Sequence, residues 1–133
     1  MRKRILAVVF MLAVLVGGHF AIRPRMARAQ NSPNGLTMGT TVTASTAAGA
    51  NYFYLLLSGG NVTTFSFSNP AVQTPGIVTV VFQQDSTGSR TVGWATNIVA
   101  TPTITSTANK YTVVNFFYDS ASQSWYAMST AHN

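Results

Sequence analysis

The chain has 133 residues, of which 47% are hydrophobic and 8% charged, with eight Lys and Arg side chains, two acidic ones and no cysteine. Every basic residue except Arg90 and Lys110 precedes Gln30, so the formal net charge of +6 belongs to the first segment of the chain. Beyond that segment these two cations balance Asp85 and Asp119, which leaves none of the clustered positive charge that phosphate backbones require. The composition therefore argues against a nucleic-acid partner, and the lack of cysteine excludes a disulfide framework.

The first 29 residues have the pattern of a secretory signal peptide. A positive cluster, Arg2-Lys3-Arg4, precedes the uncharged apolar stretch 5–17, which is shorter than the roughly 20 residues that a spanning helix needs. Ala27-Arg28-Ala29 then presents small residues two apart, as a signal-peptidase site requires. We expect cleavage after Ala29, so that the mature chain begins at Gln30.

Two alternatives to cleavage stay open for this segment. Arg23, Arg25 and Arg28 follow the apolar stretch, and basic residues tend to remain on the cytoplasmic side of a membrane. The segment would then be an uncleaved N-terminal anchor, or translation would start at Met26.

With the signal removed, no other stretch is apolar and long enough to enter a membrane, and the protein would be secreted or displayed at the cell surface. A start at Met26 would instead suit a virion protein.

Residues 40–133 are predicted to form one β-rich domain behind a polar, flexible lead-in, residues 30–39. Thr, Val, Ser, Phe and Tyr dominate from Thr40 onward, and these side chains suit a pleated surface better than a helix. Turn-forming residues recur about every 8 to 14 positions. This regular spacing predicts an all-β fold, a single antiparallel β-sandwich that is jelly-roll-like or an up-and-down meander.

Alternating side chains mark the expected strands of this domain. They span residues 40–45, 52–57, 62–67, 77–83, 90–95, 102–105, 111–118 and 125–129. Pro102 predicts an edge position for the short strand that it begins, and the last two strands are expected to form a hairpin across the loop at Asp119. The strand 111–118 is apolar on both faces, so we expect it to be central in its sheet or to lie at a subunit contact.

Few side chains beyond Gln30 can exchange protons near neutral pH, as acid–base catalysis requires. They are Asp85, Asp119 and His132, and the histidine is the penultimate residue. Both aspartates begin turns, where a carboxylate caps its own backbone, and Arg90 is expected to pair with Asp85 across its loop. We therefore predict no catalytic residue, no metal site and no cofactor, in a protein that is not an enzyme.

The aromatic side chains are the remaining candidates for function. An aromatic ring can pack against the C–H face of a sugar, but aromatics also dominate the cores of small β domains. We expect five of them to build the core: Trp94, Trp125, Phe116, Tyr118 and Phe82. Because Tyr126 alternates with Trp125 along a strand, it should face the other way. With Tyr52 and Tyr54 it makes the candidate ligand-binding set.

One stretch of the chain follows a pattern shared with a known family. Its parts are Gln84-Asp85 at the end of an apolar strand, residues 87–94 (TGSRTVGW), Pro102-Thr103, the turn Thr107-Ala108-Asn109, the segment 116–119 (FFYD) and Trp125. Residues 61–129 therefore resemble the β-rich structural module of bacteriophage tail-fibre and other tail-associated virion proteins. The chain departs from this pattern at Ser120, where glycine is usual, and in its signal segment, which is unusual for a virion protein.

The resemblance implies a non-catalytic structural or attachment module, tail-like in a virion or extracellular, that self-associates into a homo-oligomer or filament. The near-zero charge beyond Gln30 and the Thr-rich strands suit such self-association. The alternative is a secreted carbohydrate-binding module that contacts a host-surface glycan through exposed aromatics.

Overall fold

The computed structural model of the protein describes residues 33–68 and 76–133, so the expected signal segment lies outside the described residues. These residues form strands and one short 3₁₀ helix, η1 (Ala47–Gly49), and no α-helix occurs among them. The strands are β1 (Asn34–Gly35), β2 (Thr41–Ser45), β3 (Tyr52–Leu57), β4 (Val62–Ser68), β5 (Ile77–Gln84), β6 (Val92–Trp94), β7 (Ile98–Val99), β8 (Tyr111–Asp119) and β9 (Ser124–His132).

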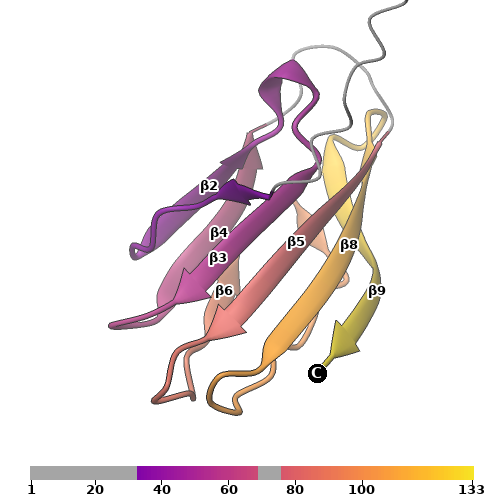
Figure 1. Ribbon diagram of the computed structural model, residues 1–133. Helices are drawn as coiled ribbons and strands as arrows, with labels where there is room; N and C mark the ends of the chain where they lie inside the picture. Colours follow the sequence, from indigo (N-terminus) through magenta and orange to yellow (C-terminus); the bar gives the residue numbers. More distant parts are fainter. Residues whose placement is uncertain (1–32, 69–75) are drawn as a thin grey trace, which may run out of the picture.

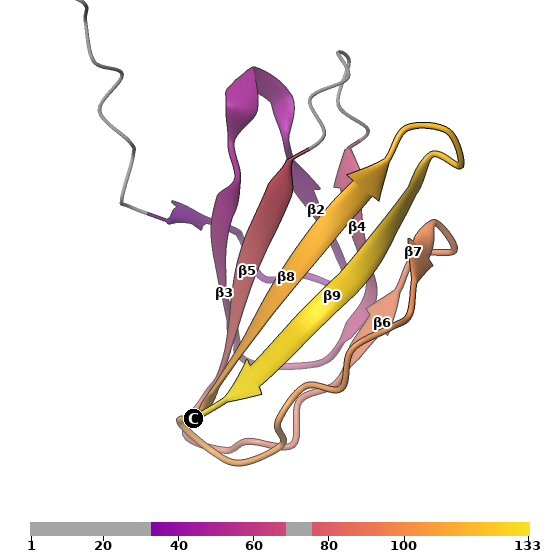
Figure 2. The same ribbon diagram turned by 90° about the vertical axis from the view of Figure 1, so that its right-hand side faces the viewer.

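The strands form two sheets that stack as the layers of a sandwich (Figure 1). The larger sheet has six strands in the order β1-β3-β5-β8-β9-β7, and the smaller has three in the order β2-β4-β6. In Figure 2, β3, β5, β8 and β9 lie side by side facing the viewer, with β2 and β4 behind them. The expectation of an all-β sandwich is confirmed.

Successive strands from β1 to β7 alternate between the two sheets, and this alternation sets the direction of pairing. Because each connection carries the chain across the sandwich, strands that become neighbours within one sheet run the same way. β1–β3, β3–β5, β2–β4 and β4–β6 are accordingly parallel. β7–β9, a pair within the six-stranded sheet, is parallel as well. β5–β8 and the β8–β9 hairpin are antiparallel. The six-stranded sheet is therefore mixed and the three-stranded sheet is parallel, so the antiparallel pairing expected for a jelly roll or meander is corrected.

Hydrophobic side chains from both sheets meet between the layers. On β5, Val78, Val80 and Phe82 are buried, whereas Ile77 is 53% exposed, as the two-residue period of a strand requires. The buried hydrophobic core consists of Val42, Ala44, Phe53, Leu55, Leu57, Val62, Phe65, Phe67, Val78, Val80, Phe82, Ile98, Val114, Phe116, Tyr118 and Trp125.

Aromatic rings occupy the centre of this core. Phe82 and half-buried Trp94 both pack edge-on against Phe65, with ring centroids 5.2 and 5.7 Å from it. Trp125 stacks on Phe67 at 4.3 Å. Phe116 and Tyr118, the other aromatics expected in the core, are 0% and 7% exposed. Rings from both sheets thus hold the layers together.

Two segments differ from the strand pattern expected for them. Residues 102–105 form no strand, and the short strand of this region is β7 instead. The Thr105 N–H donates to the Thr112 hydroxyl at 2.8 Å, and the Thr105 carbonyl accepts from the Gln84 side chain at 2.6 Å. Side-chain hydrogen bonds therefore replace the backbone pairing that a strand would make here. The expected lead-in contains β1, and the Leu36 N–H donates to the Tyr54 carbonyl at 2.8 Å.

Candidate functional site

Asp85 begins the turn after β5, and the hydrogen bonds of its carboxylate hold that turn. One carboxylate oxygen accepts from the N–H groups of Thr87 and Gly88 at 3.0 and 2.9 Å. The other accepts from two nitrogens of Arg90 at 3.1 and 3.0 Å. These donors lower the pKa of Asp85, and the hydrogen bond from Arg90 makes the largest contribution. The carboxylate is ionised and occupied with its own loop.

Asp119 plays the same part at the tip of the β8–β9 hairpin. It accepts from the Ser122 hydroxyl at 2.6 Å and from the N–H of Ala121 at 3.0 Å. The Ser122 hydroxyl is the main cause that lowers the pKa of Asp119. The Ser122 Oγ also lies 3.5 Å from the hydroxyl of Tyr126. This carboxylate, too, is tied into a turn.

The two carboxylates lie at opposite ends of the sandwich. The Asp85 end of β5 pairs with the start of β8, through the Gln84 N–H and the Lys110 carbonyl, whereas Asp119 ends β8. The nine residues of β8 separate them by roughly 27 Å at ~3.4 Å per residue. A carboxylate pair for glycoside hydrolysis needs a separation of roughly 5 to 10 Å. Asp85 and Asp119 cannot act on one bond within this chain.

His132 lies near the end of β9, where its Nδ1 is 3.2 Å from the Thr112 hydroxyl. That hydroxyl oxygen already accepts the Thr105 N–H. The imidazole therefore contacts a hydroxyl that supports the backbone of residues 102–105. In the part of the chain that the structure describes, no three His, Asp or Glu side chains gather where a metal ion could be held.

The outer face of the six-stranded sheet, the side turned away from the core, carries most of the exposed aromatic and aliphatic side chains. We define this outer face by four rows that the strand register sets. They are Ile77–Phe117–Tyr126–Val99, Tyr52–Thr79–Asn115–Ser129, Tyr54–Val81–Val113–Ala131 and Leu56–Gln83–Tyr111. Ile77, Leu56 and Phe117 are 53%, 40% and 37% exposed. The strands that present these rows face the viewer in Figure 2.

The three candidate ligand-binding tyrosines all lie on this outer face. Tyr52 and Tyr54 are on β3, and Tyr126 is on β9, with β5 and β8 between them. Three strand spacings separate the two groups by roughly 14 Å across the strands, and Tyr126 is also displaced along them. The Tyr54 hydroxyl donates to the Gln83 side chain. Burial, and next the neighbouring Tyr111, raise the pKa of Tyr54.

The outer face of the three-stranded sheet differs from the outer face of the six-stranded sheet. Its side chains are hydroxyls, and we call it the hydroxyl face: Thr41, Thr43, Ser45, Thr64, Ser66 and Ser68. The Thr43 and Ser66 hydroxyls lie 2.9 Å apart. This is the ordinary pattern of a sheet with one side in water.

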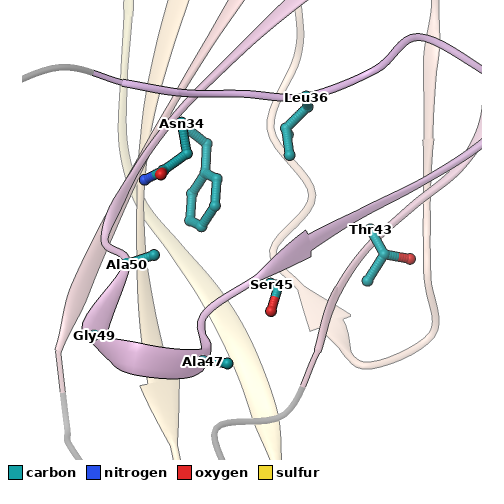
Figure 3. A pocket seen from close by; sticks show the side chains of 8 residues that line it. Asn34, Leu36, Thr43, Ser45, Ala47, Gly49 and Ala50 are labelled. Atoms are coloured by element: carbon teal, nitrogen blue, oxygen red, sulfur yellow. The ribbon is translucent and has the colours of Figure 1, made fainter.

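A hollow of about 420 Å³ lies where the edges of the two sheets diverge (Figure 3). Its lining comes from β1, β2, η1, β3 and the residues that follow β1 and η1: Asn34, Leu36, Thr43, Ser45, Ala47, Gly49, Ala50 and Phe53. None of these side chains is titratable, and the Asn34 amide donates to the Tyr52 carbonyl at 2.9 Å. The hollow offers no group for a reaction.

The aliphatic members of the outer face were not among the predicted site residues. Leu56, Ile77 and Val99 are exposed, and Val81 lies between Tyr54 and Val113. Part of the signal was present in the sequence, since the strands 52–57 and 111–118 are apolar on both faces and 77–83 carries Ile77 and Val81 on its second face. Only the pairing of β3, β5 and β8 in one sheet shows that their second faces form one surface.

Such a sandwich, with its carboxylates engaged in turns and a sheet face as its exposed chemistry, belongs to the class of structural and binding modules. Residues 29–123 match the family described as "Putative phage tail fibre C-terminal domain". The chain belongs to this phage tail-fibre family, as the pattern in residues 61–129 indicated. It is therefore a structural or attachment module of tail-fibre type and is associated with the virion.

No curated protein and no solved structure matches the chain. Among the described residues, no helix is long and apolar enough to cross a membrane.

Proposed function

We propose that this chain is a non-catalytic tail-fibre module that associates with further copies of itself in the virion. The observation that carries the proposal is the outer face of the six-stranded sheet, because it exposes Ile77 beside Phe117 in one row and Leu56 and Tyr111 in another. Monomeric soluble proteins rarely expose large contiguous apolar patches, and such patches mark interaction sites.

Two further observations support a structural role. Both carboxylates are engaged in local turns, as the ion pair between Arg90 and Asp85 at 3.0 Å illustrates. A cysteine-free domain of this size must obtain its stability from its core, from oligomerisation or from both. Association through an apolar face would supply the second source.

Light scattering on the purified protein tests the self-association. We expect a mass that is a multiple of the protomer and that falls on dilution. A single-protomer mass at every concentration would refute self-association and leave the family assignment untouched.

A second candidate function is the recognition of a host-surface glycan. It is favoured by one observation, that Tyr52, Tyr54 and Tyr126 lie on the same exposed face. Tyrosine rings can stack on sugars, and their hydroxyls can bond to sugar hydroxyls. A glycan array probed with the wild type and with Tyr126→Ala tests this. Binding that survives the substitution would remove Tyr126 from the site.

The place of assembly depends on the first 29 residues. We propose that a cleaved signal sends the mature chain out of the cell, and a start at Met26 is the alternative that fits assembly of a virion inside the cell. The N-terminus of the protein distinguishes the two.

A further inference from the structure

The outer face of the six-stranded sheet is nearly free of charge. Its four rows contain no Lys, Arg, Asp or Glu. Asp119 lies at the margin, where β8 ends, and its carboxylate is held by Ser122 and the turn backbone. Depletion of charge at the centre and polar groups at the rim are typical of protein–protein interfaces.

Several polar side chains in these rows already bond to one another. The Thr79 hydroxyl donates to the Asn115 carbonyl oxygen at 2.8 Å, and the Asn115 amide donates to the Ser129 hydroxyl at 2.9 Å. The Tyr54 hydroxyl donates to Gln83 in the same way. Burial of a polar group costs little free energy when its hydrogen bonds are made within the protein. These paired side chains can therefore lose their water at low cost.

The flat projected size of the outer face comes close to the lower bound for a specific contact. Four strands about 4.8 Å apart, with about seven residues each at ~3.3 Å per residue, give a projected area of roughly 440 Å². Two such faces bring together roughly 900 Å² before the relief of the side chains is counted. Specific interfaces begin near 1,000 Å² of total buried area.

We infer that the outer face of the six-stranded sheet docks onto the same face of a second copy of this chain. Because the face is neutral, two copies meet without like charges, as a self-complementary surface must. A nucleic acid or an anionic membrane would require cations, and the four rows contain none. This inference rests on the proposed self-association and specifies where it occurs.

Lysine substitutions on the two outer surfaces of the sandwich test this inference. Ile77→Lys places a charge in the apolar row of the outer face, and Val99→Lys does so at the other end of the same row. Thr41→Lys is the matched control, because Thr41 is an exposed side chain of the hydroxyl face. Each variant is expressed from its full-length gene and purified in the form, processed or not, that the cell produces. A thermal unfolding curve then shows that the variant is folded.

We expect both outer-face variants to weaken association at least tenfold by light scattering, and Thr41→Lys to match the wild type. If the wild type associates and Ile77→Lys and Val99→Lys associate equally well, the inference is wrong while self-association stands. If Thr41→Lys alone dissociates, the hydroxyl face is the contact and the inference is again wrong. A wild type that never associates refutes both proposals. Binding to neutral lipid vesicles by a monomeric wild type would identify a membrane as the occupant instead.

Discussion

The Gln84 side chain bonds to both backbone polar groups of Arg90, accepting its N–H at 2.9 Å and donating to its carbonyl oxygen at 2.8 Å. The same amide nitrogen donates to the Thr105 carbonyl at 2.6 Å. Gln84 is fully buried, so its amide takes the place of a strand for two segments that lack one. The Gln84-Asp85 pair of the family pattern thus has a structural explanation.

Gln84→Met keeps the side-chain volume but leaves part-buried N–H and carbonyl groups of Arg90 and Thr105 unpaired. We expect it to reduce the free energy of unfolding by about 3 kcal/mol. Gln83→Met is the control, since its side chain lies on the outer face and its partner Tyr54 is half-buried. We expect that change to cost less than ~1 kcal/mol. Urea unfolding measures both. Equal losses would contradict the role assigned to Gln84.

Gly93 lies against the backbone of β4, where a β-carbon would collide with the Thr63 carbonyl oxygen. The pairing of β4 with β6 is irregular at this point, and glycine in a strand often marks such a close approach. Gly93→Ala is therefore expected to cost at least ~2 kcal/mol of stability. Gly60 has open space around it, so Gly60→Ala should stay within ~0.5 kcal/mol of the wild type. A mild effect at Gly93 would show that the two strands can separate without loss.

The sequence predicted the strands well and their partners poorly. The strand Tyr52–Leu57 matches β3, and Tyr111–Tyr118 is central in its sheet between β5 and β9, because a period of two identifies strands locally. The same period shows which side chains face inward but not which sheet a strand joins. The parallel pairs therefore could not be predicted, since they follow from a chain that crosses the sandwich at each connection. The outer face could not be predicted for the same reason.

Acid should destabilise the protein through Asp85. The pKa of Asp85 is lowered in the folded protein, chiefly by the Arg90 hydrogen bond. The ionised carboxylate therefore stabilises the fold above the unfolded-state pKa of about 3.9. This stabilisation is lost as the pH falls through the lower pKa of the folded state. We expect the urea concentration at the unfolding midpoint of the wild type to fall once the pH is below about 4. Asp85→Asn should be less stable at neutral pH and show a shallower drop in acid. Identical pH profiles would exclude a contribution from this carboxylate.

The N-terminus of the purified protein decides how it reaches its place of assembly. Edman sequencing or intact mass should give Gln30 as the first residue, because Ala27-Arg28-Ala29 fits a signal peptidase. Ala29→Arg should then block processing and leave a longer chain. A first residue of Met26 would show an internal start, and an intact segment from Met1 would show an anchor.

Maleimide labelling is the most direct test of the central claim, that the outer face is where copies meet. The chain has no cysteine, so Ile77→Cys and Thr41→Cys each place a single thiol, on the outer face and on the hydroxyl face. As the protein concentration rises through the range of association, labelling of Ile77→Cys should slow at least tenfold while that of Thr41→Cys stays constant. Thiols that react equally fast at every concentration, in a protein that light scattering shows to be associated, would contradict the account.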